Sequence, residues 1–345
     1  MNKLDREARS KIIHLLCEGQ SIRAVTRLTG ASKNTVVRLL IDAGRACGEY
    51  QDRVLRNLSC KRVQLDEIWS FVYSKQDNVK RAKSAPANAG DAWTWTALCA
   101  DTKLLITTLV GQRNLDCALI FVDDLKSRLA HRVQITSDGL AIYLPAMDTV
   151  FGDDADYVML QKIYGSSLEG ERRYSPAVCL GARKREVTGN PDPRHISTSY
   201  VERQNLTMRM HMRRFTRLTN AFSKKLENLA YQVALHQMFY NFVRVHQTLR
   251  VTPAMAAGVT DRLWEIGDIV AVIEAWEAEQ ATAGTTYETG KNRIGGGFYV
   301  KVLPRYEQPK EPIYGFETRE AAEAWIVADR AKHRPGRRPK LAVAV

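Results

Sequence analysis

The order of strand-like and helix-like segments from Arg62 to Tyr164 constrains the fold more than any other feature of this chain. Three runs rich in β-branched and aromatic residues come first: VQLDEIWSFVY, WTWTALCAD and LLITTLVG. A helical stretch from about Leu115 to Leu129 follows, then the short buried run VQITS, a second helical stretch to about Val150 and the strand-like YVMLQKIY. Three strands in succession and then alternating helix and strand predict an α/β fold with a mixed sheet covered by helices.

Residues 1–48 have the pattern of three helices separated by glycine-containing turns. The first is expected from about Asp5 to Cys17; Ser21 can cap the second, which stops at Gly30, and Ser32 can cap the third. These are the parts of a helix-turn-helix, in which the N-terminal residues of the last helix face the major groove. The alternative is a plain three-helix bundle with solvated polar faces. The residues expected to contact DNA are Ser32, Lys33, Asn34, Thr35 and Arg38.

Changes in composition predict the other boundaries. Two long helices are expected after the sheet, from about Ser199 to Arg217 and from about Ser223 to Thr248. In chain order we expect a helix-turn-helix domain at 1–48, a polar connector at 49–61, a sheet-containing core at 62–258 with an irregular basic insertion at about 165–198, a helical extension at 259–280, a Gly/Thr-rich linker at 281–297, and a small ββα module with a basic tail at 298–345.

The chain is strongly basic. Its 345 residues include 51 Lys and Arg against 38 Asp and Glu, a formal net charge of +13. The densest positive stretch lies between Glu202 and Arg250. Such a charge suggests a polyanionic partner, here nucleic acid, although charge alone indicates attraction and not activity.

Cysteine usage and the N-terminus bear on the cellular compartment. The six cysteines form no C-x-x-C pair, which argues against a zinc ribbon or a disulfide framework and fits a reducing compartment. The N-terminus MNKLDREARSK has no apolar segment, and no run approaches the ~18 apolar residues of a membrane span. We therefore expect a cytoplasmic protein with no membrane partner.

Three carboxylates are candidates for a metal site: Asp66 in LDEIWSFVY, Asp138 after VQITS, and Glu202 in YVERQN. Carboxylates brought together from separate strands and a helix suit a hard cation such as Mg²⁺, whose remaining ligands are often substrate phosphates. Strand alternation points Asp66 and Glu67 to opposite faces, so only one of them is expected in the site, and periodicity does not choose between them. Asp138 has an alternative as a turn residue, because Asp-Gly after a strand is a common turn signal.

Glu202 has two interpretations of its own. Ser199 to Glu202 fits a capping box, in which the Glu only satisfies a free N–H at the start of the helix. At about 100° per residue, however, Glu202, Arg209 and Arg213 lie on one helical face with Arg217 close to it. A carboxylate in line with arginines suits a metal ion at one end and phosphate contacts along the rest. A solvated basic face remains the alternative.

LDEIWSFV, SDGL and YVERQN with its trailing arginines resemble the transposases of the insertion-sequence-one type, which are DDE recombinases with a ribonuclease-H-like core. A second block, YNFVRVHQTLRVTPAMAAG, resembles the segment that follows the catalytic Glu in many integrase-like transposases. The resemblance covers about residues 10–270. It implies that Asp66, chosen over Glu67, forms a catalytic metal triad with Asp138 and Glu202. It also implies two Mg²⁺ ions, for which Mn²⁺ can substitute, no small-molecule cofactor, and a homo-oligomer on double-stranded DNA. The arginines expected to contact that DNA are Arg203, Arg209, Arg213 and Arg217.

The resemblance implies a DNA transposase of an insertion sequence. Such an enzyme binds terminal inverted repeats and catalyses metal-dependent 3′-end cleavage and strand transfer. Two alternatives stay open: a ribonuclease-H-like nuclease without strand transfer, and a helix-turn-helix regulator with an inactive core. Metal-dependent cleavage separates the enzymes from the regulator, and a strand-transfer product separates transposase from nuclease.

Overall fold

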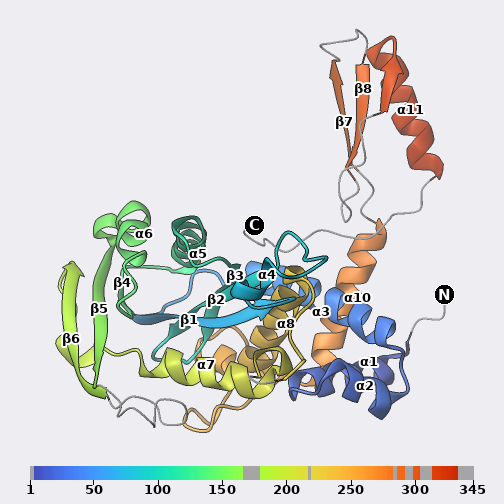
Figure 1. Cartoon of the computed structure of the whole chain (residues 1–345). Helices are drawn as coiled ribbons and strands as arrows, with labels where there is room; N and C mark the ends of the chain where they lie inside the picture. The colour runs from blue at the N-terminus through green and yellow to red at the C-terminus, as the bar shows by residue number, and fades with distance from the viewer. Residues whose placement is uncertain are drawn as a thin grey trace. The chain divides into compact units, whose positions relative to one another are not determined.

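The computed structural model describes residues 4–165, 179–216, 219–282, 286–291, 298–303 and 313–332 (Figure 1). The chain divides into two compact units, Met1–Val270 and Ala271–Leu341. The first unit contains the N-terminal helices, the large sheet and the helices that cover it. No helix in the described ranges combines the length and apolar character needed to cross a bilayer.

The first unit is built on a six-stranded mixed sheet in the order β3-β2-β1-β4-β5-β6. β1, β2 and β3 are antiparallel neighbours, β4 runs parallel to β1, β5 runs parallel to β4, and β6 returns antiparallel to β5. The α/β fold with a mixed sheet predicted from the order of the segments is confirmed. The strands are β1 (Arg62–Val72), β2 (Gly90–Cys99), β3 (Leu105–Gly111), β4 (Val133–Ser137), β5 (Ala155–Tyr164) and β6 (Cys179–Thr188).

Strand β6 lies in the stretch that was expected to be an irregular insertion, so this part of the prediction is wrong. Every residue from Cys179 to Val187 is exposed, and the strand is held by backbone pairing with β5. An exposed edge strand rich in Lys and Arg carries no apolar alternation, and such charges also discourage pairing with other chains. Residues 166–178 of the expected insertion lie outside the described residues.

Helices cover both faces of the sheet (Figure 1). On one face, Ile68 and Val72 of β1 pack with Met208, Met212 and other buried residues from the segments that follow β6. On the opposite face, the Trp95 ring packs against Phe121 and Tyr143. The helices of this core are α4 (Gln76–Val79), α5 (Leu115–Arg128), α6 (Tyr143–Val150), α7 (Ser199–His211), α8 (Leu226–Met238), the π-helix η4 (Phe239–Val243) and α9 (Pro253–Ala256), with 3₁₀ turns η1 (Gly152–Asp154), η2 (Pro193–His195) and η3 (Arg213–Phe215).

The N-terminal helices are α1 (Arg6–Cys17), α2 (Ile22–Thr29) and α3 (Lys33–Val54). Their expected caps are confirmed: the Ser21 hydroxyl accepts from the Ala24 N–H, the Ser32 hydroxyl accepts from the Thr35 N–H, and Gly30 ends α2 with φ of 73°. Helix α3 continues through the first half of the stretch expected as a polar connector. It does so because its C-terminal half packs against α8: a Cβ at Gly44 would lie closer than 3.0 Å to Tyr231.

The two long helices predicted after the sheet are shorter in the structure. Helix α7 ends at His211, because Met212 is extended and both Met212 and Phe215 turn into the core. The second helix ends at the π-helix η4, so residues 244–248 are not helical. Arg213 therefore lies beyond the end of α7, and the prediction that it shares a helical face with Glu202 is wrong. Arg217 lies outside the described residues.

Helix α10 (Ile266–Thr282) follows the core and begins seven residues after the start of the stretch expected as a helical extension. In the second unit, the predicted ββα arrangement is wrong by one strand, because β7 forms inside the stretch expected as a linker. Its sequence TYETGK is too polar to stand out, but each of its residues pairs in register with β8. The elements are β7 (Thr286–Lys291), β8 (Phe298–Leu303), β9 (Ile313–Phe316) and α11 (Arg319–Lys332), packed around Val300, Ala322 and Ile326.

Candidate functional site

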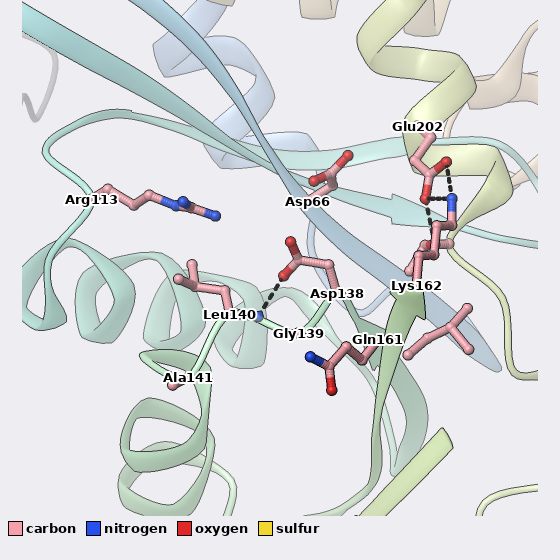
Figure 2. A pocket seen from close by; sticks show the side chains of 11 residues that line it. Asp66, Arg113, Asp138, Gly139, Leu140, Ala141, Gln161, Lys162 and Glu202 are labelled. Atoms are coloured by element: carbon pink, nitrogen blue, oxygen red, sulfur yellow. Dashed lines mark hydrogen bonds and ion pairs between the residues drawn. The ribbon is translucent and has the colours of Figure 1, made fainter. Parts of the chain in front are cut away.

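One pocket of about 560 Å³ in the first unit is lined by Asp66, Asp138 and Glu202 (Figure 2). Asp66 lies within β1, Asp138 directly follows β4, and Glu202 lies in the first turns of α7. β1 and β4 are parallel neighbours with Gln64 opposite Thr136, so two residues further along Asp66 and Asp138 come to the same place in the sheet. The structure thus brings together the three carboxylates singled out from the sequence.

The Asp66 carboxylate is fixed by two donors. It accepts a hydrogen bond from its neighbour's backbone N–H at 2.8 Å and another from Asn205 Nδ2 of α7 at 2.8 Å. The Asn205 Oδ1 accepts in turn from the Thr96 hydroxyl at 3.3 Å. Burial, together with the nearby charges of Asp138 and Glu202, raises the pKa of Asp66 to about 6 despite these donors. The site thus holds more negative charge than its own donors stabilise.

Glu67 joins the same cluster, which corrects the expectation that only one of the adjacent acids could do so. One oxygen each from Asp66, Glu67 and Asp138 lie within 4.8 Å of one another. The two side chains do leave opposite faces of β1. Asp138, however, lies beyond the last residue of β4, where carboxylates from either face can reach it.

The surroundings of Glu67 are drier than those of Asp66. Its side chain is 1% exposed, and its Oε2 accepts from Arg113 Nε at 3.2 Å and Nη2 at 3.0 Å. Oε1 is buried without a hydrogen bond of normal geometry, although the Tyr143 hydroxyl is close enough to lower the pKa of the carboxyl. Burial and the charge of Asp138 outweigh these effects and raise the pKa of Glu67 to about 7.

Asp138 serves the local turn as well as the pocket. Its Oδ1 accepts from the Leu140 backbone N–H at 2.9 Å, which is an Asx-turn. The interpretation of Asp-Gly as a turn signal is therefore confirmed. Figure 2 shows the Asp138 side chain beside Asp66 in the pocket, so the two roles are compatible.

The capping-box interpretation of Glu202 does not describe the structure. The N-cap of α7 is Thr198, so Glu202 lies four residues after the cap and not three. The free N–H groups of Tyr200 and Val201 are instead satisfied by Gln64 Oε1 of β1, at 2.9 and 3.0 Å. Glu202 is thereby available to the pocket, where it accepts from the Thr198 hydroxyl at 2.6 Å and contacts Lys162 Nζ through both oxygens (Figure 2).

This donor set fits a hard divalent cation. The pocket offers only carboxylate oxygens as strong ligands, which Mg²⁺ and Mn²⁺ prefer. Burial first, and then the neighbouring carboxylates, raise the pKa values of Asp66 and Glu67, and a bound cation would favour their ionised forms. Asp66, Glu67 and Asp138 are close enough together to hold such an ion. Glu202 lines the same pocket, and in this structure Lys162 is bound to its carboxylate.

Three residues of this site were not predicted from the sequence: Arg113, Lys162 and Asn205. Glu67 was set aside there in favour of Asp66. Asn205 stands in the YVERQN block, three residues after Glu202, and a spacing of three on a helix places both on one face. That spacing could have identified it. Lys162 and Arg113 come from β5 and from the loop before α5, and no local pattern connects either to the carboxylates.

The basic residues expected to contact DNA lie in different environments. Arg209 is half-buried on α7, on the same side as Glu202, whereas Arg203 is exposed on the opposite side and lines a second pocket. Arg213 is exposed in the 3₁₀ turn after α7. At the start of α3, Ser32 and Thr35 are bonded to each other through the cap, while Lys33, Asn34 and Arg38 are exposed.

No protein-family model and no curated protein matches this sequence. Solved structures that it resembles include complexes of transposases and an intasome. The piggyBac transposase synaptic complex with hairpin DNA is 8% identical, with a TM-score of 0.37 over 82% of this chain and 74% of that chain. The simian T-cell lymphotropic virus intasome in complex with PP2A regulatory subunit B56 gamma is 14% identical, with a TM-score of 0.33 over 88% of this chain and 95% of that chain. The Mos1 transposase paired-end complex has a TM-score of 0.19 at 13% identity, over 46% of this chain and 60% of that chain. Because these TM-scores are below 0.5, the function proposed below rests on the residues of the site.

Proposed function

We propose that this protein is a DDE transposase that cuts and rejoins DNA at the ends of an insertion sequence. The observation that carries the proposal is the convergence of Asp66, Asp138 and Glu202, from two parallel strands and a helix, in one pocket. The sheet order supports it, because three antiparallel strands followed by two parallel ones agree with the ribonuclease-H-like core expected from the sequence.

The residues of the pocket have distinct tasks in this proposal. Two divalent ions held by the carboxylates would activate the attacking oxygen and stabilise the leaving oxygen. Asn205 holds the Asp66 carboxylate in place, and Thr198 and Lys162 do the same for Glu202. The Arg113 guanidinium lines the pocket, bound to Glu67 and packed over the Trp93 ring at 4.4 Å, where it adds positive charge for a phosphate.

The chemistry needs no protein nucleophile. Water attacks the phosphodiester in 3′-end cleavage and releases a 3′-hydroxyl, and this hydroxyl attacks a phosphate of the target DNA in strand transfer. The protein binds the two DNA ends together, so we propose a homo-oligomer on DNA. The helix-turn-helix formed by α2 and α3 would recognise the terminal inverted repeats through the exposed side chains of Lys33, Asn34 and Arg38.

The first test is metal-dependent cleavage of duplexes that carry the inverted repeats flanking the gene. Asp66→Asn, Asp138→Asn and Glu202→Gln should each abolish cleavage in Mg²⁺ or Mn²⁺ while specific DNA binding stays measurable, because affinity comes mainly from the basic surface. Asp148→Asn on the exposed surface of α6 is the matched control and should cleave normally. Full activity in any of the three variants removes that residue from the site.

The second test concerns the recognition of DNA ends. Asn34→Ala and Arg38→Ala should lower the ratio of specific to non-specific affinity, at about 1–3 kcal/mol per lost bidentate base contact. Arg209→Ala and Arg213→Ala should instead weaken binding to end DNA and scrambled DNA alike and flatten its salt dependence. If the Asn34 and Arg38 variants keep full discrimination, α3 does not recognise the ends.

Two other functions are separated by the same assays. A nuclease without strand transfer would cleave the ends but give no joined product with a target plasmid. A regulator with an inactive core would bind end DNA and cleave nothing in any metal. The crowding of carboxylates in the pocket favours an enzyme, because a regulator has no need for buried acids with raised pKa values.

A further inference from the structure

A second pocket lies on the side of α7 that faces away from the carboxylates. Its volume is about 360 Å³, within the range of roughly 300–1,000 Å³ that is usual for ligand sites. Tyr200, Arg203 and Thr207 line it from α7, and Lys103 lines it from the turn between β2 and β3. Tyr240, Arg244 and His246 complete it from η4 and the loop that follows.

The electrostatics of this pocket are one-sided. Its lining includes the cations Lys103, Arg203 and Arg244 and no acidic residue. Across the described residues, none of these three cations forms an ion pair, whereas arginines elsewhere in the chain, such as Arg113 and Arg128, are bound to carboxylates. Burial and the charges of Lys103 and Arg244 lower the pKa of His246. The pocket therefore lacks a negative counter-charge of its own.

Some residues of the YNFVRVH segment anchor it to the turn between β2 and β3, and others line the pocket. Asn241 is fully buried and bonds the Leu105 backbone, accepting from its N–H and donating to its C=O, both at 2.9 Å. The Tyr240 hydroxyl donates to the Lys103 carbonyl at 3.1 Å and so holds the turn that carries Lys103. Arg244, whose Nη1 is bonded to His211 Nε2, and His246 line the cavity. A π-helix, often found at functional sites, sets this arrangement.

Tyr200 supplies an aromatic surface beside the cations. Lys103 Nζ lies over its ring, 3.4 Å from the centroid, yet the residue remains 46% exposed. An exposed ring next to cations that have no carboxylate partner among the described residues is the combination that binds single-stranded nucleic acid, since bases stack on the ring and cations contact the phosphates. A base inside a duplex offers no free face, so a pocket of this size takes a nucleotide only after it has left the stack.

We propose that this pocket binds one nucleotide of a single-stranded DNA end, with the base on Tyr200 and the phosphate on Arg203 and Arg244. The inference deepens the proposed function, on which it rests. Tyr200 and Gln204 each lie two residues from Glu202, about 160° away round α7, so the pocket lies about one helix diameter, ~10–12 Å, from the carboxylates. The nucleotide would thus belong to an unpaired strand next to the scissile phosphate.

The test uses the full chain and an oligothymidylate of eight nucleotides that carries a single 2-aminopurine. EDTA is present so that no cleavage occurs. Stacking on Tyr200 should quench the 2-aminopurine fluorescence. Tyr200→Leu should weaken binding about tenfold and abolish the quenching, while Tyr200→Phe should behave as wild type. The Tyr200 side chain is exposed and makes no hydrogen bond that holds α7, so the Leu variant should fold. Wild-type affinity and quenching in Tyr200→Leu would overturn the proposal.

A second arm tests the phosphate contact. Arg244→Gln should lower the slope of log affinity against log salt by about 0.7, the value for one phosphate of a single strand. Arg319→Gln on α11 removes the same charge from an exposed site and should leave the slope unchanged. An unchanged slope in Arg244→Gln would remove the phosphate contact from the proposal.

The remaining arms separate a DNA strand from a free nucleotide and this inference from the proposed function. Thymidine monophosphate should displace the strand only at far higher concentration; displacement with equal affinity would overturn the assignment to DNA. A blunt duplex should not quench. Binding is measured without metal, so the two proposals can fail separately. If the protein quenches through Tyr200 but cleaves no DNA with metal, the transposase proposal fails and the nucleotide pocket stands. If Tyr200→Leu cleaves and binds as wild type does, the nucleotide pocket fails and the transposase proposal stands.

Discussion

Asn205 holds the Asp66 carboxylate, and its removal should make stability depend more strongly on pH. In Asn205→Ala, Asp66 loses a hydrogen bond of 2.8 Å and Thr96 loses a weaker one of 3.3 Å. A hydrogen bond to a charged group contributes roughly 1.5–3 kcal/mol, and one between neutral groups roughly 0.5–1.5 kcal/mol. Because the pKa of Asp66 is about 6, its carboxyl is ionised at pH 8 and mostly protonated at pH 5. We therefore expect a loss of about 2–4.5 kcal/mol at pH 8 and about 1–3 kcal/mol at pH 5, with the loss at pH 8 larger by about 1–1.5 kcal/mol.

The sign follows from the direction of the pKa shift. The pKa of Asp66 is raised in the folded protein, so its ionisation already costs stability as pH rises through about 6. Removing the Asn205 donor raises that pKa further, since the donor favours the ionised form. The variant must then lose stability relative to wild type as pH rises. The loss of the Thr96 bond and of the side-chain volume is the same at both pH values.

The measurement is urea unfolding followed by tryptophan fluorescence, in EDTA, at pH 5 and pH 8. Asn241→Ala is the matched control, because Asn241 is equally buried but bonds only the Leu105 backbone, which does not titrate in this range. Its loss of stability should be the same at both pH values. An equal loss at pH 5 and pH 8 for Asn205→Ala would refute the coupling between Asn205 and the charge on Asp66.

Three further changes test other parts of the structure. Glu67→Gln should gain stability relative to wild type as pH rises from 5 to 8. The raised pKa of Glu67, about 7, means that ionisation of its carboxyl destabilises the wild-type fold. Melting temperatures measured in EDTA at the two pH values test this. Gln64→Ala should lower stability by about 1–2 kcal/mol by leaving two N–H groups of α7 uncapped, and a loss below 0.5 kcal/mol would argue against the cap. Gly44→Ala should cost about 1–3 kcal/mol by forcing α3 away from Tyr231, whereas Gly267→Ala, with open space around it, should be neutral or stabilising.

The parts of the fold that could be predicted from sequence are those with local chemical signals. The serine caps and Gly30 define the N-terminal helices because each satisfies a backbone requirement within a few residues. The strands of the central sheet are predictable because their apolar residues are buried on both faces. Edge strands β6 and β7 escaped prediction, because an edge strand is held by the backbone of its neighbour and leaves no apolar pattern.

The site shows the same division. The pattern of strands and helices made Asp66, Asp138 and Glu202 candidates, and the resemblance joined them in one site and chose Asp66 over Glu67. That Glu67 belongs to the cluster could not be predicted. The alternation of side chains describes one strand by itself, and it does not show that the neighbouring strand β4 ends just before Asp138. The end of α7 at His211 is likewise set by tertiary packing of Met212 and Phe215, which overrides a sequence that would continue the helix.

The block YVERQN gains its meaning from the way α7 is packed. Because β1 caps the helix through Gln64 and the core holds its buried side, the rotation of α7 about its axis is fixed. That rotation alone decides which residues face the carboxylates and which face the second pocket. A substitution that lets α7 rotate should therefore impair metal-dependent cleavage and single-strand binding together, although it touches neither site. The block accordingly serves three surroundings. Tyr200 and Arg203 line the second pocket, whereas Glu202 lines the carboxylate pocket and Asn205 holds Asp66 there. Val201 packs in the core, and Gln204 bonds the buried His236.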